Sequence, residues 1–293
     1  MLLPILLAAA AEPDATPMPD PVRAMLEAAM ASGSEAEVAT VAKYARLAAP
    51  DAAQAVTDAV DRWRGERRES RDRELREADL LELWTGRAEV GGFVTTGNSA
   101  TAGGTALLDL TREGLRWRLK LHAQADYAET RGVTTREHYQ LGFEPNVKLD
   151  DRLYAYGAAQ YESDRFFGYT DRLALSTGLG YAALRRSGLT LDVELGPAYR
   201  ATAFTDGRNE RTFAGRGTVD LDWQLTDGLT FRQDAAAYLD SYNSTLTGTT
   251  ALAAKVLGPI SAQLSYSVQY ESRPPEGRGT TDTTSRASLV YSF

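Results

Sequence analysis

The chain has 293 residues, a net charge of −8, no cysteine and a mean hydropathy of −0.34. This length fits one large domain with a small additional module. The lack of cysteine excludes disulfide frameworks, thiolate metal sites and cysteine nucleophiles, and the acidic balance argues against a nucleic-acid partner. No run of about 18 apolar residues occurs, which excludes helical membrane spans.

Residues 1–11 resemble an export signal. They form an apolar run that ends in alanines, which is typical of a signal core followed by a small-residue cleavage site. The lysine or arginine that normally precedes such a core is missing, so this signal peptide is atypical. We expect cleavage after Ala10 or Ala11; the alternative is a loose apolar terminus.

Residues 12–82 are predicted to form a helical leader. The dipeptide Asp20-Pro21 is typical of a helix start with proline in the first turn. Ser34 and Glu37 fit a capping box, in which each residue satisfies a free backbone N–H near the start of the helix. We expect that helix to end before Pro50, because proline disfavours helical geometry in the residue that precedes it.

A third helix is expected from about Asp51. Residues 64–74 within it carry balanced charge and little apolar content, so we interpret them as a solvated helix or a linker. A plug that enters a barrel, or a segment that docks in the periplasm, remains an alternative. The expected apolar face of the helix consists of Ala52, Ala55, Val56, Ala59, Val60 and Trp63.

From residue 83 to residue 293 the chain alternates apolar and polar residues with a period of two. Between Leu115 and Tyr127, every odd position is apolar or aromatic and every even position is polar or charged. Since a strand sends successive side chains to opposite faces, one face is oily and the other hydrated. Ordinary strands have about 5–6 residues, whereas a tilted strand that crosses a bilayer needs about 9–11. The pattern therefore predicts an all-β membrane protein, an antiparallel transmembrane β-barrel.

About twelve strands can be placed in this region, and an even number is typical of bacterial single-chain barrels. Short connectors such as 113–114 alternate with longer ones such as 203–211. Short periplasmic turns and long external loops are the usual asymmetry, so we expect both ends of the chain in the periplasm. The predicted strands are 84–95, 102–112, 115–128, 137–149, 152–163, 171–185, 189–202, 212–225, 229–240, 245–256, 260–271 and 281–293.

Aromatic residues with outward parity gather near both ends of the predicted strands. Two such girdles are typical of side chains at the two bilayer interfaces, and a soluble sandwich has no reason to form them. The loop-side girdle is predicted to contain Tyr127, Tyr139, Tyr161, Tyr199, Phe213 and Tyr270, and the turn-side girdle Trp117, Trp223, Phe231 and Phe293.

The last strand ends in Phe293, with Tyr291 two positions before it. This ending resembles the C-terminal signal by which outer-membrane proteins engage the barrel assembly machinery. The alternative is a final strand that simply ends in phenylalanine. We expect contact with that machinery during insertion, and with outer-membrane lipid and lipopolysaccharide afterwards.

Charged residues with inward parity form two groups, with Arg216 and Arg232 among the acidic ones. In a barrel of about twelve strands these groups would lie roughly opposite each other. Opposed charges along a narrow aqueous path are typical of selective pores; the alternative is that they neutralise one another and fill a closed barrel. The basic group is Arg116, Arg118, Lys120 and Lys148, and the acidic group is Asp192, Glu194, Asp220, Asp222 and Asp234.

A lipid or lipopolysaccharide hydrolase is the alternative function. A serine–histidine site needs a base within hydrogen-bond reach of the nucleophile. The chain has two histidines, His122 and His138, and the hairpin register predicts Phe143 and Tyr127 as their respective neighbours. Neither histidine has an obvious serine and acid partner, so we interpret both as ordinary lumen residues. No phosphate loop, zinc spacing or calcium loop occurs, so we expect no cofactor and no metal.

Several motifs resemble a bacterial family of salt-induced outer-membrane proteins, whose domain has no established function. The resemblance covers residues 84–293 and leaves the leader outside; it carries over no catalytic residues and implies a link to salt or osmotic stress. The motifs are Trp84-Thr85-Gly86, Gly91-Gly92-Phe93-Val94-Thr95-Thr96-Gly97-Asn98-Ser99, Tyr161-Glu162-Ser163-Asp164-Arg165-Phe166-Phe167-Gly168-Tyr169 and Leu195-Gly196-Pro197-Ala198-Tyr199-Arg200.

Together these observations predict a barrel in the outer membrane of a Gram-negative-type envelope, with its leader in the periplasm. We expect a non-enzymatic protein, either a narrow solute or ion pore or a structural protein related to osmotic or salt stress. A soluble β protein is a third interpretation.

Overall fold

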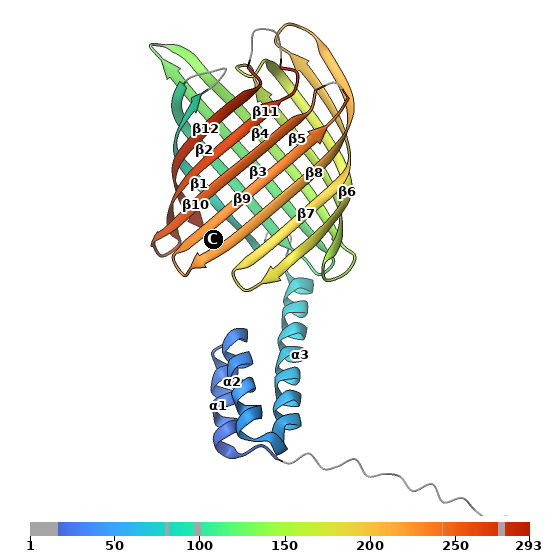
Figure 1. Ribbon diagram of the computed structural model, residues 1–293, viewed down its shortest axis with the longest axis vertical. Coiled ribbons are helices and arrows are strands. Elements are labelled where there is room, and N and C mark those ends of the chain that lie inside the picture. Colours follow the sequence, from blue (N-terminus) through green and yellow to red (C-terminus); the bar gives the residue numbers. More distant parts are fainter. Residues whose placement is uncertain (1–16, 80–81, 97–100, 242, 275–278) are drawn as a thin grey trace, which may run out of the picture. The chain divides into compact units, whose positions relative to one another are not determined.

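The computed structural model describes residues 17–79, 82–96, 101–241, 243–274 and 279–293. The chain divides into two compact units, Met1–Glu77 and Ala78–Phe293. The first unit is helical and the second is a β-barrel (Figure 1). The export signal predicted at residues 1–11 lies outside the described residues.

The first unit contains three helices, α1 (Asp20–Ala31), α2 (Glu35–Ala48) and α3 (Ala53–Glu77), with a short 3-10 segment, η1 (Pro50–Ala52), before α3. The Ser34 hydroxyl accepts the Glu37 N–H at 3.3 Å and caps α2. The Glu37 carboxylate accepts a hydrogen bond from Ser32 Oγ at 2.5 Å instead of reaching back to the Ser34 amide. Only half of the predicted capping box therefore forms.

The three helices bury a small apolar core. Val56 and Val60, on the predicted apolar face of α3, are buried against Leu26 of α1 and Val38 of α2, and Trp63 packs at the edge of this cluster. Beyond residue 65 most side chains of α3 are charged and exposed, so its second half is a solvated helix. None of the described helices is both long and apolar enough to cross a membrane.

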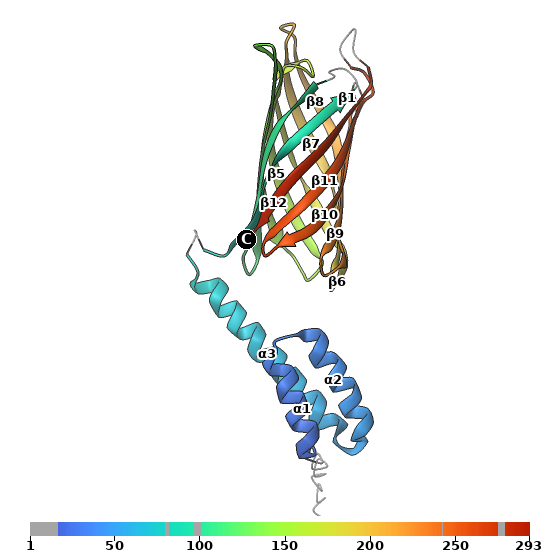
Figure 2. The ribbon, with the colours of Figure 1, turned by 90° about the vertical axis from the view of Figure 1, so that its left-hand side faces the viewer.

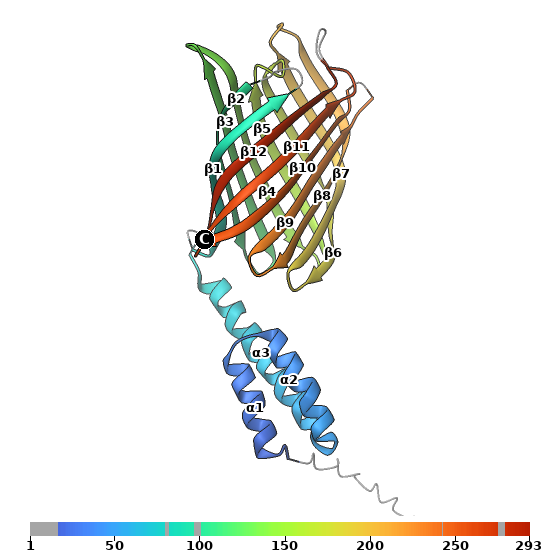
Figure 3. The ribbon, with the colours of Figure 1, turned by 60° about the vertical axis from the view of Figure 1, so that its left-hand side comes forward.

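The second unit is a closed barrel of twelve antiparallel strands, and this confirms the predicted fold class. Each strand pairs with its neighbours in sequence, and β12 pairs with β1 to close the ring (Figures 2 and 3). The strands are β1 (Trp84–Thr96), β2 (Thr101–Glu113), β3 (Trp117–Thr130), β4 (Val133–Lys148), β5 (Leu153–Asp164), β6 (Tyr169–Arg186), β7 (Leu189–Phe204), β8 (Asn209–Thr226), β9 (Leu229–Leu239), β10 (Thr245–Leu257), β11 (Ile260–Glu271) and β12 (Thr281–Ser292).

We call the end where β1 begins and β12 finishes the turn end, and the opposite end the loop end. At the loop end, β1 to β8 run further than predicted, so the connections between them are shorter there, whereas β9 to β12 do not extend beyond their predicted loop-end limits. β3 and β4 meet at Arg131 and Gly132, whose φ angles of 53° and 76° permit a two-residue hairpin turn. The connection expected at 203–211 spans only residues 205–208. The difference in length between the two sets of connections is therefore smaller than expected.

The barrel reverses the burial pattern of a soluble protein. On β7, outward Leu195 is 71% exposed, whereas inward Glu194 next to it is 2% exposed. On β11, outward Leu264 is 66% exposed and inward Gln263 is 5% exposed. A polar interior with a continuous apolar exterior is stable only where hydrocarbon covers the outside. The barrel is therefore of the transmembrane type.

The aromatic residues assigned to the two girdles lie on the outside of the barrel. Phe213 is 82% exposed, and its ring centroid lies 5.2 Å from that of Tyr199 on β7. At the turn end, the rings of Tyr291 and Phe293 stack with their centroids 5.8 Å apart. Trp117, Tyr199 and Phe231 are partly exposed, and the remaining girdle residues Tyr127, Tyr139, Tyr161, Tyr270 and Trp223 are exposed.

Candidate functional site

The lumen of the barrel holds the candidate site, and near the turn end four charged side chains form a closed circuit. Lys120 Nζ on β3 lies 2.9 Å from Glu144 Oε1 on β4 and 3.8 Å from Glu194 Oε1 on β7. Arg216 on β8 lies 3.0 Å from Glu194 Oε2 and 3.6 Å from Glu144 Oε2. We call Lys120, Glu144, Glu194 and Arg216 the charged ring. It joins β3 and β4 to β7 and β8 across the lumen.

Two tyrosines of β5 fill the space between the charged ring and the wall. The Tyr154 hydroxyl donates to Glu194 Oε1 at 3.0 Å, and the Arg118 guanidinium lies 5.0 Å from the centroid of the Tyr154 ring. The guanidinium of Arg216 lies 5.1 Å from the centroid of the Tyr156 ring. Both tyrosines are at most 5% exposed. The arc of wall from β4 to β7 is therefore filled by side chains at this level.

Apart from Arg116, which lies in the connection before β3, the members of the two predicted charge groups lie on the strands expected, and most members of the two groups form ion pairs. Besides the ring residues, Lys148 pairs with Glu113 at 2.5 Å. Arg185 pairs with Asp192 at 2.8 Å, and Arg232 pairs with Asp222 at 2.5 Å. Sequence reasoning missed Glu144, which had the same inward parity as Lys120 but lay outside both predicted groups.

Four members of the predicted groups make no ion pair with another described residue. Asp220 and Asp234 lie opposite each other on β8 and β9, and Arg116 is exposed at the turn end. Arg118 stacks on Tyr154 instead of meeting a carboxylate. Within the two predicted groups, the charges without an ion pair to a described residue are thus two basic and two acidic side chains.

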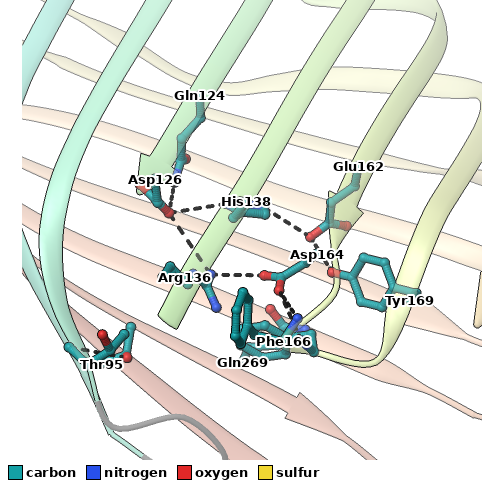
Figure 4. A network of polar contacts seen from close by, with 12 residues as sticks. Thr95, Gln124, Asp126, Arg136, His138, Glu162, Asp164, Phe166, Tyr169 and Gln269 are labelled. Atoms are coloured by element: carbon teal, nitrogen blue, oxygen red, sulfur yellow. Dashed lines mark hydrogen bonds and ion pairs between the residues drawn. The ribbon is translucent and has the colours of Figure 1, made fainter. Parts of the chain in front are cut away.

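At the loop end a second set of charges surrounds His138 of β4 (Figure 4). His138 Nδ1 lies 3.1 Å from Asp126 Oδ2 on β3, and His138 Nε2 lies 3.3 Å from Glu162 Oε1 on β5. Both ring nitrogens of His138 therefore face a carboxylate. Arg136 of β4 lies 3.0 Å from Asp164 of β5. We call Asp126, Arg136, His138, Glu162 and Asp164 the loop-end network.

Asp126 is the hub of the loop-end network and is 1% exposed. Thr105 Oγ1 donates to it at 2.6 Å and Gln124 Nε2 at 2.9 Å. Arg286 of β12 donates to the same carboxylate at 3.2 Å, although β1 and β2 separate β12 from β3 along the wall. One carboxylate therefore connects residues on four strands.

Further bonds at the loop end cross the lumen. Arg172 on β6 lies 3.5 Å from Glu271 on β11, and Arg200 on β7 donates to Thr245 Oγ1 on β10 at 3.0 Å. The Arg172 guanidinium also lies 3.8 Å from the centroid of the Tyr169 ring. Sequence reasoning did not identify the contacts of Arg172 with Glu271 and of Arg200 with Thr245, because each joins two strands that are not neighbours.

The lumen encloses a cavity of about 420 Å³, which we call the chamber. On β3 its lining begins at His122 and continues through Gln124, so it lies on the loop-end side of Lys120. A second hollow of about 710 Å³ opens at the turn end and is lined by Arg116, Arg118, Lys148 and other side chains. The charged ring therefore separates two hollows of the lumen.

The two histidines differ from the prediction in their cross-strand neighbours and in their partners. The predicted register was wrong by one residue, since His122 pairs with Gly142 and His138 with Asp126. The tight turn between β3 and β4, together with a bulge between residues 128 and 129, sets the actual register. Each histidine has a carboxylate partner that sequence reasoning did not identify: His122 Nδ1 lies 2.6 Å from Asp109, and His138 Nδ1 lies 3.1 Å from Asp126.

Neither histidine forms a hydrogen bond with a serine in the part of the chain that the structure describes. Over the same residues, no group of three or more histidine, aspartate or glutamate side chains is arranged to hold a metal ion. The described residues thus offer no support for the hydrolase alternative.

The chain is similar to proteins already known. The family described as "Protein of unknown function, DUF481" matches residues 88–293. The uncharacterized protein YdiY of Escherichia coli (strain K12) is 28% identical over 217 residues, which cover 74% of this chain and 86% of that protein.

Two solved outer-membrane proteins also align with the barrel. A NanC porin is 14% identical with a TM-score of 0.48, covering 70% of this chain and 98% of that chain. An outer-membrane channel from Pseudomonas putida F1 is 10% identical with a TM-score of 0.44, covering 74% and 100% respectively. The family match confirms the resemblance drawn from residues 84–293 and leaves the helical unit outside it. By the extent of that match, the chain belongs to the family "Protein of unknown function, DUF481".

Proposed function

We propose that the protein is a narrow pore of the bacterial outer membrane for small solutes or ions, and that it is not an enzyme. The observation that carries the proposal is the polar lumen, which contains two hollows with the charged ring between them. Barrels of about eight strands are filled by side chains and barrels of about sixteen contain open channels. A twelve-stranded barrel with internal hollows and one charged restriction fits a path for small species only.

The proposed orientation places the turn end and the helical unit in the periplasm. Both ends of the barrel sequence lie at the turn end, and three of its connections have two residues each. The longest connection, residues 272–280 between β11 and β12, lies at the loop end. This asymmetry supports the usual arrangement of bacterial barrels, in which short turns face the periplasm.

The proposed surroundings follow from the outer face. The exposed leucines and aromatics of the strands would contact outer-membrane lipid and lipopolysaccharide. Tyr291 and Phe293, stacked on the outside of β12, would be presented to the barrel assembly machinery during insertion.

Planar-bilayer recording of the refolded full-length chain tests the pore. We expect a small conductance in the unaltered protein and a larger one in the double variant Glu144→Ser/Arg216→Ser. This change removes one acid and one base from the charged ring, so the net charge stays the same. The side chains that narrow the path become smaller, and the path widens.

The matched control is Asp206→Ser/Arg208→Ser. These residues form an exposed ion pair of 2.7 Å in the connection between β7 and β8, outside the restriction, and the change should leave the conductance as it was. If none of the three proteins conducts ions in the bilayer, the proposal of a pore is overturned, and a structural role in the envelope is favoured.

A further inference from the structure

The middle of the chamber is lined by uncharged groups that form hydrogen bonds. On one side, Gln140 of β4 and Gln160 of β5 line the cavity. On the other side, Thr247 and Thr249 of β10 and Ser265 and Ser267 of β11 line it. Two walls of amides and hydroxyls thus lie between the charged ring and the loop-end network.

The amide groups of the two glutamines are available to a ligand. Neither Gln140 nor Gln160 forms a hydrogen bond with another described residue, and both are partly exposed to the cavity. An amide offers two donors and an acceptor oxygen, and a hydroxyl offers both roles as well. This mixture matches ligands that carry several hydroxyl groups, each of which donates and accepts.

Most charges that border the chamber already have partners. Arg87 lies 2.7 Å from Asp109, and Arg286 donates to Asp126 at 3.2 Å. Asp234 is exposed to the cavity and makes no ion pair with another described residue. Glu89, which accepts hydrogen bonds from Gln263 and Ser288, and Arg200, which donates to Thr245, also make no ion pair with another described residue. Two carboxylates and one guanidinium of the lining are thus without an ion-pair partner, and this balance disfavours anionic ligands.

The size of the chamber also fits a small ligand. Its volume of about 420 Å³ lies within the roughly 300–1,000 Å³ of small-molecule sites. Ala174, Ala236 and Ala251 line it where larger side chains would occupy the space.

We propose that the chamber binds uncharged polyhydroxylated solutes of the size of a monosaccharide or disaccharide, held by the amides of Gln140 and Gln160 and the facing hydroxyls. This inference rests on the proposed pore, for which it names the class of substrate. A bound sugar would occupy the lumen between the charged ring and the loop-end network. It would obstruct the ion path while it stays there.

Block of the ion current by sugar tests the site. Sucrose added to the unaltered protein in a planar bilayer should reduce the current in a saturable manner. Glucuronate, which carries a carboxylate, should not. In the double variant Gln140→Met/Gln160→Met, which keeps side-chain length but removes the amides, the half-blocking sucrose concentration should rise at least about tenfold.

Gln224→Met is the matched control, because Gln224 is exposed near the turn end of β8 and is not part of the chamber lining. It should leave block by sucrose unchanged. A conducting protein that sucrose does not block, or that glucuronate blocks equally well, overturns the sugar site and leaves the pore intact.

If the protein conducts no ions, the pore fails, and equilibrium dialysis of radiolabelled sucrose against the full chain in detergent still tests the site. Binding that the methionine variant weakens would then support the site, and no binding would overturn it.

Discussion

Lys120 on β3 and Glu194 on β7 lie 3.8 Å apart across the lumen, although β4, β5 and β6 separate them along the wall. Each also contacts a second opposite charge, Lys120 with Glu144 and Glu194 with Arg216. Because the four charges share partners and Glu194 is 2% exposed, the loss of one basic member leaves a carboxylate without full compensation.

We therefore expect Arg216→Met to lower the free energy of unfolding by about 3 kcal/mol, the lower end of the cost of breaking a buried ion pair. The double variant Arg216→Met/Glu194→Gln should recover part of that loss, since it also removes the uncompensated charge. Urea unfolding in detergent measures both. Arg208→Met, which removes an exposed arginine, is the control, and a loss no larger than the control's would contradict the role of the ring.

A second prediction concerns Asp126, which accepts hydrogen bonds from residues on several strands. Asp126→Ala should destabilise the barrel more than Asp171→Ala, which removes an exposed carboxylate bound to the Tyr161 hydroxyl at 2.8 Å. We expect a difference of roughly 3 kcal/mol in the free energy of unfolding. Bilayer recordings should also show a noisier current, because Arg286 would lose its partner. Equal effects of the two substitutions would show that the hub does not brace the barrel.

The strands and their faces could be predicted from the sequence because both depend on local alternation. Lys120 and Glu194 were assigned to the lumen from parity alone, and the structure places both there. Their contact could not be predicted, since it depends on the tilt and radius of the closed ring. The same holds for Arg172 and Glu271, which face each other only after the barrel has closed.

The hairpin between β3 and β4 shows a second limit. Its register was misplaced by one residue, and that shift concealed the pairing of His138 with Asp126. A positive φ at Arg131, a residue without the conformational freedom of glycine, gave no strong turn signal in the sequence. The bulge that follows has no signal of its own in the residue types, so the contacts around His138 required coordinates.

The third prediction tests how closely the ring of Tyr154, next to the charged ring, is packed. A Cβ atom on Gly180 of β6 would collide with the ring of Tyr154, whose hydroxyl donates to Glu194. Gly180→Ala should therefore displace the ring and lower the free energy of unfolding by about 1–3 kcal/mol, as overpacking does. Gly215→Ala is the control, because a Cβ there meets no atom within 4 Å. Unfolding in urea compares them, and equal stabilities would indicate that the ring of Tyr154 has room to move.

The fourth prediction concerns pH and the connection between β4 and β5. The carboxylate of Asp150 accepts the backbone N–H groups of Arg152 and Leu153, both at 2.7 Å, and these bonds hold its pKa below the usual value of 3.8. A lowered pKa in the folded state means that the stabilisation is present above the usual value and is lost as the pH falls through the folded value.

The stability difference between the unaltered protein and Asp150→Ala should therefore be largest near neutral pH and disappear in strong acid. The contribution is small because the turn is exposed and solvent screens it. Asp151→Ala is the neighbouring control: it removes a carboxylate but leaves the two backbone hydrogen bonds of Asp150 in place. A difference that persists below the folded pKa would contradict the assignment to the charged carboxylate.

The last prediction concerns the segment that leads into β1. Arg112 of β2 donates to the carbonyl oxygens of Asp79 at 2.7 Å and Glu82 at 3.0 Å, and its guanidinium lies 4.7 Å from the centroid of the Trp117 ring. The residue is 3% exposed, and Nε and Nη2 of its planar guanidinium both donate to these carbonyls. Lysine keeps the charge but cannot form the fork or stack in the same way.

Arg112→Lys should therefore release the backbone at Asp79 and Glu82 while the barrel stays closed. Limited trypsin digestion should then cleave after Arg76 several times faster than in the unaltered protein, because proteases act on backbone that is not held. Arg116→Lys, at an exposed arginine of the same end, should leave the rate unchanged. Since both variants keep a basic residue, a common acceleration would point to general loosening of the turn end, and no acceleration in either would show that Arg112 does not fix this segment.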